Sequence, residues 1–495
     1  MDDKWIMETP ETHDDNIRTE CASTHEVASG VIDNLDEVSP ARRKPNSALD
    51  KFIHTAKLGA GLFADSYDLF VIDSVLAILN EVRGLSTEQE QAQLGITDSS
   101  KGAVAAATSF GAVAGMLIFG FLSDRLGRRK LLVVTAACVA IGALACAVIV
   151  QPNDSITMSS QLVIFRVVVG IGIGGEYPLS AAATLETPGS DNSIIHKMLR
   201  AARLFCMQGG GMVTAAVVAL MLIAAGCPLD YAWRILLGLG AIPALVAVYT
   251  RVQHMEETEG FTRNVEQGQE STLPATPVLE QLLKMKSVVL TTCSLWFLLD
   301  ITFYGTAQFR SAIESKLFDD GPTAGGSPQD RLVHVTAFSL IVALAGLPGY
   351  LLSAHYVLKR FDVWLVQLAG FSALVFLYIG IGFLVDLNAP VVLSLVVFAF
   401  TFFVTNLGPN MTTFIIPPMM FPTNIRTTGH GIAAASGKLG AAIGSYLLPV
   451  FLHEYGLAAV MYFCGGVALV GMLVCMASLR VREICIWRES HRCLT

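Results

Sequence analysis

Long apolar runs separated by short polar segments make up most of the chain beyond its first 50 residues. A helix needs about 20 mostly apolar residues to cross a bilayer, and about twelve runs are of that order. They lie near 56–79, 103–122, 131–150, 161–184, 203–226, 232–251, 286–309, 334–354, 363–385, 389–417, 429–452 and 456–479. The pattern predicts an all-α membrane protein with about twelve transmembrane helices.

A polar segment at residues 252–285 separates the sixth run from the seventh. This segment is rich in Glu, Gln and Thr and shows no helical periodicity of apolar residues, so we expect a cytosolic linker. It divides the chain into an N-terminal six-helix bundle at 51–251 and a C-terminal one at 286–480. We expect an acidic, disordered cytosolic tail at 1–50 and a cytosolic tail at 481–495.

Composition and charge agree with a membrane protein. Of 495 residues, 53% are hydrophobic and 15% charged, with a mean hydropathy of +0.56, whereas soluble domains carry about 25% charged residues. The formal charge of −8 comes mostly from residues 1–50, which hold twelve acidic and five basic side chains. The ten cysteines have no metal-ligand spacing. We expect no metal, no cofactor and no nucleic-acid partner.

Basic residues cluster at helix ends that should share one side of the membrane, because Lys and Arg favour the cytosolic side. They precede the first run and follow the second and the last: Arg42, Arg43, Lys44, Lys51, Arg125, Arg128, Arg129, Lys130, Arg480, Arg482, Arg488 and Arg492. We expect a multi-pass protein with both termini in the cytosol, in the plasma membrane.

Carboxylates interrupt the first run, which reads GLFADSYDLFVID from residue 61. A charge inside the hydrocarbon is costly and usually faces a protein interior or an aqueous cavity, where it serves function. Asp65 and Asp68 are three residues apart and share one helix face. A weak internal repeat aligns Asp65 with Asp300 of LLDITFYG in the seventh run. Such halves can enclose a site at the midplane.

Two strings connect these runs to a known family. The loop GFLSDRLGRRK, with Asp124, Arg125 and Arg128, resembles the signature loop of the major facilitator superfamily, where it forms a cytosolic gate. The fourth run reads GIGIGGEYPLS, whose glycines allow another backbone to approach closely. Packing explains the glycines but not Glu176 and Tyr177.

Together with DSYDLF, these strings resemble the phosphate:proton symporters of that superfamily, over residues 51–480. The resemblance implies two pseudo-symmetric six-helix bundles and coupled import of inorganic phosphate and protons. It implies a substrate site at Tyr177, Gln208, Trp296, Asp300, Tyr304 and Asn410. It implies proton-coupling groups at Asp65, Asp68, Glu176 and Asp300, with Arg166 and Lys438 as candidate charge partners. Lys438 could attract the anion or neutralise Asp300; we favour the second role, because a lone buried charge is costlier than a pair.

Dihydrogen phosphate suits this set of side chains, because it offers two O–H donors and several acceptor oxygens. Trp296, Asp300 and Tyr304 are four residues apart and share one helix face. An ionised Asp300 can only accept, so it would favour a protonated phosphate and repel sulfate, which carries no proton at neutral pH.

Three positions depart from the family pattern. Glu176 stands in place of the usual aspartate, Asp73 in place of an asparagine, and Met419 in place of an acid after the tenth run. Glu176 keeps a titratable group but changes its reach. Asp73 adds a third acid to the first helix, and Met419 removes a cytosolic salt-bridge partner.

Alternatives remain open at this point. A carrier of organic phosphates such as glycerophosphodiesters would fit a reshaped cavity, and a phosphate sensor could signal through the tails. An enzyme is not expected, since the chain has no GxSxG, Walker loop or HExxH. Sequence does not decide between protons and sodium as the coupling ion, nor does it fix the oligomeric state.

Overall fold

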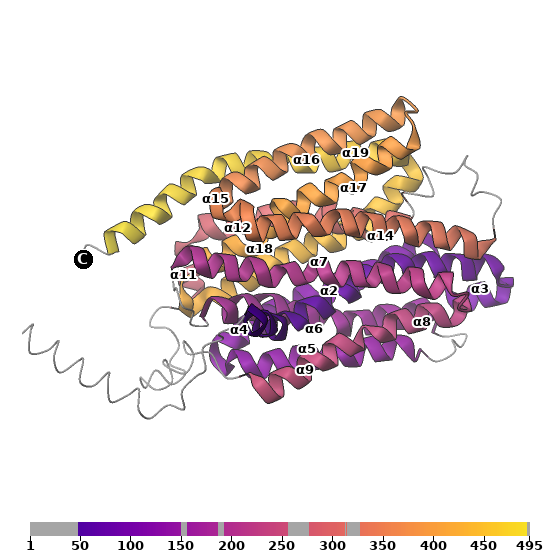
Figure 1. The fold of residues 1–495 in the computed structure, drawn as a ribbon, viewed down its shortest axis with the longest axis horizontal. Coiled ribbons are helices and arrows are strands. Elements are labelled where there is room, and N and C mark those ends of the chain that lie inside the picture. The colour runs from indigo at the N-terminus through magenta and orange to yellow at the C-terminus, as the bar shows by residue number, and fades with distance from the viewer. Residues whose placement is uncertain are drawn as a thin grey trace, which may run out of the picture. The chain divides into compact units, whose positions relative to one another are not determined.

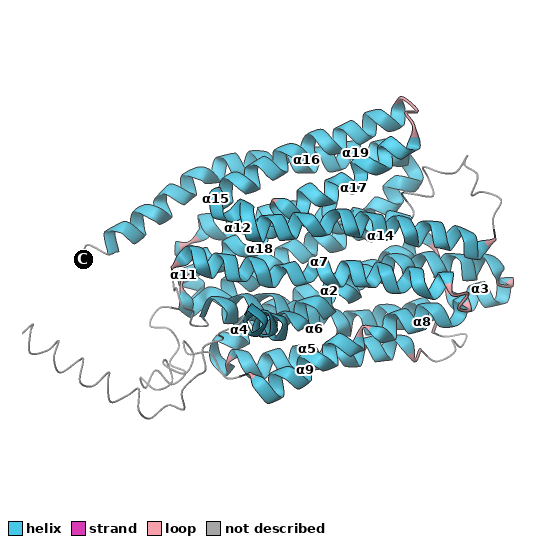
Figure 2. Ribbon diagram, viewed as in Figure 1, coloured by secondary structure: helices cyan, strands magenta, loops and turns pink. Residues whose placement is uncertain are grey.

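The computed structural model describes residues 48–149, 156–186, 193–255, 277–311, 313 and 327–492. Residues up to His54 form one unit and Thr55–Thr495 a second, compact unit. The packing that positions the site lies within the second unit. All the regular elements in the described ranges are helices, as Figure 2 shows.

In the first half, long helices follow one another (Figure 1). The elements are α2 (Ala48–Leu85), α3 (Glu88–Leu94), α4 (Asp98–Leu126), α5 (Arg128–Ala147), α6 (Met158–Glu186), α7 (Ile194–Ala224), α8 (Leu229–Leu239) and α9 (Ala241–His254). Together, α8 and α9 make up one candidate membrane span. The turn between α4 and α5 is made at Gly127, whose φ of 89° favours glycine.

The second half also consists of helices. Its elements are α11 (Val278–Lys284), α12 (Lys286–Ala307), α14 (Pro328–Leu352), the π-helix η1 (Ser353–Val357), α15 (Leu358–Arg360), α16 (Val363–Asp386), α17 (Val391–Leu407), α18 (Pro409–Met420), the 3₁₀-helix η2 (Thr423–Ile425) and α19 (Arg426–Arg492). A capping box at Ser327, whose hydroxyl accepts from the amide of Asp330, starts α14.

Ten stretches of the described chain are helical, long and apolar enough to cross a membrane. The last of them includes Gly456, whose φ of 78° and ψ of 175° interrupt α19 and split it into two helices. The 38-residue α2 is outside this group because carboxylates interrupt its apolar stretch. When α19 is counted as two helices and α2 is added, the described residues hold twelve spanning segments. This confirms the number predicted from hydropathy.

Glycines let the helices of each half meet closely. A Cβ added at Gly170 or Gly174 of α6 would overlap the backbone carbonyl oxygens of Thr108 or Ala112 on α4. This confirms the predicted role of the glycine-rich string. In the second half, α12 and α19 meet in the same way at Gly440.

The two halves meet along two helix pairs. α4 packs against α19, and α7 packs against α14. Figure 1 shows α5 and α9 on one side of these pairs and α16 and α17 on the other. The fold is therefore two six-helix bundles whose facing helices can surround a central site.

Parts of the predicted domain plan cannot be compared with the structure. Residues 1–47 of the predicted tail, 256–276 of the predicted linker and 493–495 lie outside the described residues. Within the predicted linker, α11 is helical, and α19 continues as a helix to Arg492 through most of the predicted C-terminal tail. The exact bundle boundaries stay predictions.

Candidate functional site

Lys438 of α19 lies at the centre of a buried polar cluster. Its Nζ is 3.1 Å from Asp300 Oδ2 on α12 and 3.7 Å from the ring centroid of Tyr304 on the same helix. It also lies 5.2 Å from the ring centroid of Tyr177 on α6. None of these four side chains is more than 2% exposed. The ammonium therefore faces one carboxylate and two phenol rings.

Hydrogen bonds join both halves at this cluster. The hydroxyls of Tyr177 and Tyr304 are 3.5 Å apart, and Gln208 Nε2 on α7 donates to Tyr304 at 3.2 Å. Trp296 of α12 interacts with Asp300. Five of the six predicted substrate residues thus lie together, from α6 and α7 in one half and α12 in the other.

Asn410 of α18 reaches the cluster through an intermediate residue. Its Nδ2 donates to the hydroxyl of Tyr350 at 2.7 Å and to Asn406 Oδ1 at 2.9 Å. Tyr350 interacts electrostatically with Tyr177 and Asp300. Sequence reasoning missed Tyr350 and Asn406, because a single tyrosine or asparagine in an apolar run gives no signal beyond ordinary helix packing.

Several buried acceptors of the cluster have no hydrogen-bond donor in the described part of the chain. They are Gln208 Oε1 and Asp300 Oδ1, and Asp65 Oδ2 on α2. Leaving a buried acceptor unpaired costs about 1–3 kcal/mol, so such groups indicate a function for the site. A ligand that brings O–H donors would satisfy them.

The two candidate proton carriers of α2 face different partners. Asp65 is 1% exposed, and the charges that act on it are Glu176, Arg251, Asp68 and Lys438. It therefore belongs to the same charged neighbourhood as Lys438.

Asp68 packs away from this cluster. A Cβ added at Gly240 would overlap Asp68 Oδ1, so this carboxylate lies against the junction of α8 and α9. Arg166 of α6 acts on Asp68 electrostatically, but its guanidinium donates to backbone oxygens: Val104 at 3.1 Å and Asp68 itself at 3.4 Å. The structure places Arg166 beside Asp68 without a side-chain salt bridge.

Glu176 is held in a buried ion pair that the sequence did not predict. Arg251 at the end of α9 donates to Glu176 Oε2 from Nη1 at 2.8 Å and to Oε1 from Nη2. The hydroxyl of Thr135 lies 3.4 Å from Glu176 Oε2. Arg251 gave no signal because an arginine near the end of a membrane helix is already expected from the positive-inside rule.

Comparison with known proteins shows the family of the chain. Residues 58–417 match the family described as Major Facilitator Superfamily. The chain belongs to the major facilitator superfamily. It is 31% identical over 469 residues to "Probable inorganic phosphate transporter 1-6" of Arabidopsis thaliana, covering 84% of this chain and 89% of that protein.

A second relative shows the same membership, and a solved structure shows the same fold. The chain is 31% identical over 447 residues to "Inorganic phosphate transporter 1-1" of Oryza sativa subsp. japonica, covering 78% of this chain and 81% of that protein. The partially occluded, inward-open xylose transporter XylE from E. coli matches with a TM-score of 0.64 and 17% identity, over 85% of this chain and 95% of that one. The latter likeness shows the superfamily fold.

Superfamily carriers expose a central site alternately to the two sides of the membrane, so contacts that close each end matter. At one end of the helix bundles, Asp73 of α2 accepts hydrogen bonds from the amide and the hydroxyl of Ser311 at 3.1 and 2.8 Å. It also accepts from the hydroxyl of Ser339 on α14 at 2.7 Å, and Arg310 Nε lies 3.6 Å from it. The acid that sequence left unexplained therefore joins the two halves.

The opposite end is closed by the signature loop. Arg128 pairs with Asp124 at 3.1 Å and with Glu186 of α6 at 2.9 Å. The amide and hydroxyl of Thr428 on α19 donate to Asp124 Oδ2 at 3.2 and 2.8 Å. Arg125 stays outside this network: it is exposed, and its guanidinium lies over the ring of Phe121.

A further ion pair crosses the same end. Arg426 of α19 lies 3.9 Å from Glu186 of α6. Met419, which stands in place of the family's acid, packs against the hydrophobic core. Since both ends are joined and the central side chains are buried, the structure is an occluded arrangement of the carrier.

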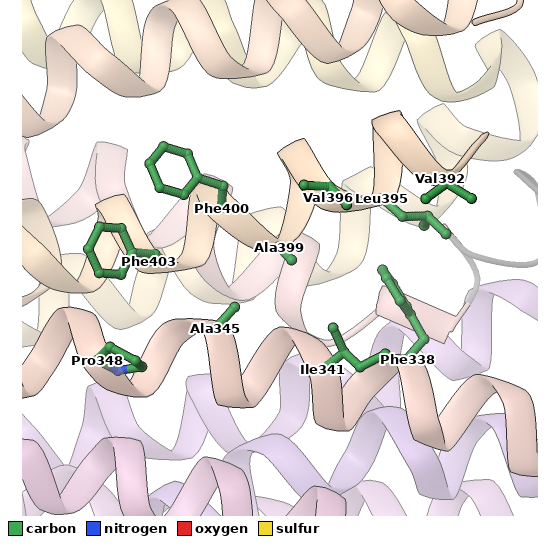
Figure 3. A pocket seen from close by; sticks show the side chains of 10 residues that line it. All are labelled: Phe338, Ile341, Ala345, Pro348, Val392, Leu395, Val396, Ala399, Phe400 and Phe403. Atoms are coloured by element: carbon green, nitrogen blue, oxygen red, sulfur yellow. The ribbon is translucent and has the colours of Figure 1, made fainter. Parts of the chain in front are cut away.

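A cleft in the described residues lies away from this site. It has a volume of about 560 Å³ and lies between α14 and α17, as Figure 3 shows. Its lining is aromatic and aliphatic, with Phe338, Pro348 and Phe403 among the residues. A surface without hydrogen-bonding side chains suits hydrocarbon and gives no selectivity for a polar solute.

Proposed function

We propose that the chain imports inorganic phosphate together with protons, by alternating access of the Lys438 cluster to the two sides of the membrane. The observation that carries this proposal is the pairing of buried donors with unpartnered buried acceptors. Tyr177, Tyr304 and Lys438 offer donors, while Gln208 Oε1 and Asp300 Oδ1 need them. Dihydrogen phosphate supplies two O–H donors and several acceptor oxygens at once.

Charge supports a monoanion as the substrate. Lys438 and Asp300 neutralise each other at 3.1 Å, so the site has no large excess of positive charge to hold a dianion. The carboxylate accepts from a protonated phosphate and repels sulfate, since a fully ionised oxyanion would leave Asp300 Oδ1 unpaired and add repulsion. The names of the curated relatives support phosphate as the transported solute.

Proton coupling is assigned to Asp65, with Asp68, Glu176 and Asp300 as the surrounding acids. Asp65 is buried beside Lys438, so its charge and that of a bound phosphate act on the same ammonium. Protonating Asp65 removes one negative charge from the surroundings of Lys438, so the anion meets less repulsion there. This link between the two bound species is what symport requires.

The same proposal covers the remaining features. The protein acts as a carrier and not as an enzyme, since the family and the site point to binding without chemistry. Both termini lie in the cytosol, so the end of the bundles at Asp124 faces the cytosol and the end at Asp73 faces the outside. The membrane is the plasma membrane.

Substrate choice is tested by uptake of labelled phosphate into proteoliposomes with competitors in excess. We expect unlabelled phosphate and arsenate, which has the same shape and protons, to compete, and sulfate and glycerophosphate to leave uptake unchanged. Strong competition by glycerophosphate would favour an organic phosphate as the substrate. Binding of phosphate without any uptake would favour a sensor.

A further inference from the structure

Arg251 has no role in the scheme above, yet it lies among the groups that surround Asp65. It is 1% exposed, and two of its nitrogens bind the Glu176 carboxylate. Its Nη1 also donates to the backbone oxygen of Leu132 at 2.7 Å. Its Nε has no partner among the described residues. A buried guanidinium with an unused donor is costly, so a second partner in another state is expected.

The Arg251–Glu176 pair lies against α2, one turn before Asp65. A Cβ added at Gly61 would overlap both Glu176 Oε1 and Arg251 Nη2. Gly61 and Asp65 are four residues apart and therefore neighbours on one helix face. Asp65 Oδ2 has no donor in the described part of the chain. The Arg251–Glu176 pair and the unpartnered acceptor of Asp65 thus belong to the same face of α2.

The charges that act on Asp65 come from four helices. They are Asp68 on α2, Glu176 on α6, Arg251 on α9 and Lys438 on α19. Lys438 is held by Asp300 and Arg251 by Glu176, so both cations are neutralised while Asp65 carries its proton. Losing that proton leaves one buried negative charge without a cation, which is unfavourable in a low dielectric.

We propose that Arg251 controls proton release from Asp65 by bridging Glu176 and Asp65. While Asp65 is protonated, Arg251 is held by Glu176. When the carrier opens at the Asp124 end, the Asp65 proton passes to water there, and Arg251 turns its Nε edge towards the new carboxylate. A guanidinium presents five donors in a planar fork and can serve two carboxylates, whereas a lysine is a single point charge. This inference rests on the proposed symport.

The test compares net transport with exchange in proteoliposomes of purified protein. Net uptake of labelled phosphate driven by an imposed pH gradient needs proton release. Exchange of labelled for unlabelled phosphate at equal pH needs only that the phosphate-loaded site is exposed to the two sides of the membrane in turn. Variants are Arg251→Gln, Arg251→Lys and Glu176→Gln. The matched control is Arg234→Gln on the same span, whose Nη1 donates to the backbone oxygens of Ala147 and Ile149.

Arg251→Gln is expected to lower gradient-driven uptake by at least about tenfold while exchange falls less than about threefold. Arg251→Lys should restore part of the uptake, because the charge is kept. In Glu176→Gln the released Arg251 stabilises the Asp65 carboxylate, since a nearby cation favours the charged form. Half-maximal uptake should then need a more acidic outside medium. Arg234→Gln should behave as the wild type.

Two results would overturn the inference. Parallel loss of uptake and exchange in Arg251→Gln, at unchanged expression, would make Arg251 a structural residue. Full gradient-driven uptake in the same variant would show that proton release does not need it. A wild-type protein that neither accumulates nor exchanges phosphate would instead refute the proposed function, which keeps the two failures distinguishable.

Discussion

Under the proposed function, the buried ion pair of Asp300 and Lys438 contributes to both substrate choice and stability. Removing one partner of a buried ion pair costs about 3–5 kcal/mol, because the other charge stays buried and unpaired. Asp300→Asn is therefore expected to lower the unfolding temperature and to weaken phosphate binding by at least about tenfold. Thermal unfolding in detergent and equilibrium binding of labelled phosphate measure the two effects.

A double variant separates these effects. Asp300→Asn combined with Lys438→Met removes both charges, so we expect the unfolding temperature to return towards that of the wild type. Phosphate binding should stay weak, since the acceptor for its O–H group and the ammonium are both lost. Recovery of binding in the double variant would contradict the role given to this pair.

Replacing Gln208 is expected to weaken phosphate binding without lowering the stability of the fold. Its Oε1 is a buried acceptor without a donor in the described chain, and its Nε2 makes one hydrogen bond to Tyr304. Replacing it by leucine removes an unsatisfied group together with one hydrogen bond, so the unfolding temperature should change little. Phosphate affinity should fall about tenfold. Unchanged affinity in Gln208→Leu would remove this residue from the site.

Between helices, the Asp73 cluster joins the two halves at the end that the proposed orientation makes the outer one. It connects α2 to Arg310 and Ser311, which follow α12, and to Ser339 of α14. Asp73→Asn keeps the shape but leaves Arg310 buried without its charge partner, so the closed outer end loses stability relative to an open one. The variant should favour the outward-open state.

Cysteine labelling measures this opening. Thr336 of α14 is buried near Ser339 in the closed structure, so Thr336→Cys serves as the probe. A membrane-impermeant maleimide added outside should label the probe at least about fivefold faster when Asp73→Asn is present. The labelling of the Asp73→Asn variant without the probe gives the background. Equal labelling of the probe with and without the Asp73→Asn substitution would show that this cluster does not govern the outer gate.

The helices could be predicted from the sequence because their signals are local. Apolar runs and the glycines at Gly170 and Gly174 depend on neighbours a few residues away, and the structure confirms them. Contacts such as Asp73 with Arg310 or Glu176 with Arg251 join residues far apart in the chain. No periodicity encodes them, so the residues could be noticed as unusual without their partners being known.

The site was predicted only in part, because some of its residues lie in strings with a local signal and others do not. Strings such as GGEYPLS carry their own signal, whereas Tyr350 and Arg251 look like ordinary membrane-helix residues until the helices are packed. Family patterns also hide chain-specific changes: Met419 has no charge, and Arg426 with Glu186 provides an ion pair across the same end.

For the whole molecule, the occluded arrangement sets the energetic problem that transport must solve. Opening the Asp73 end separates Asp73 from Arg310, and opening the Asp124 end separates Asp124 from Thr428. A carrier couples two solutes when the empty and fully loaded forms change sides more easily than the half-loaded forms. Asp65 and the phosphate site, which both act on Lys438, are the groups that can impose this condition.

The most direct test of this account is uptake of labelled phosphate into proteoliposomes at equal phosphate concentrations on both sides, with the outside more acidic than the inside. The wild type should accumulate phosphate above equilibrium, accumulation should vanish when a protonophore collapses the gradient, and Asp65→Asn should accumulate none. Uphill uptake that persists in Asp65→Asn, or in the wild type after the pH gradient is collapsed, would contradict proton-coupled phosphate import by this chain.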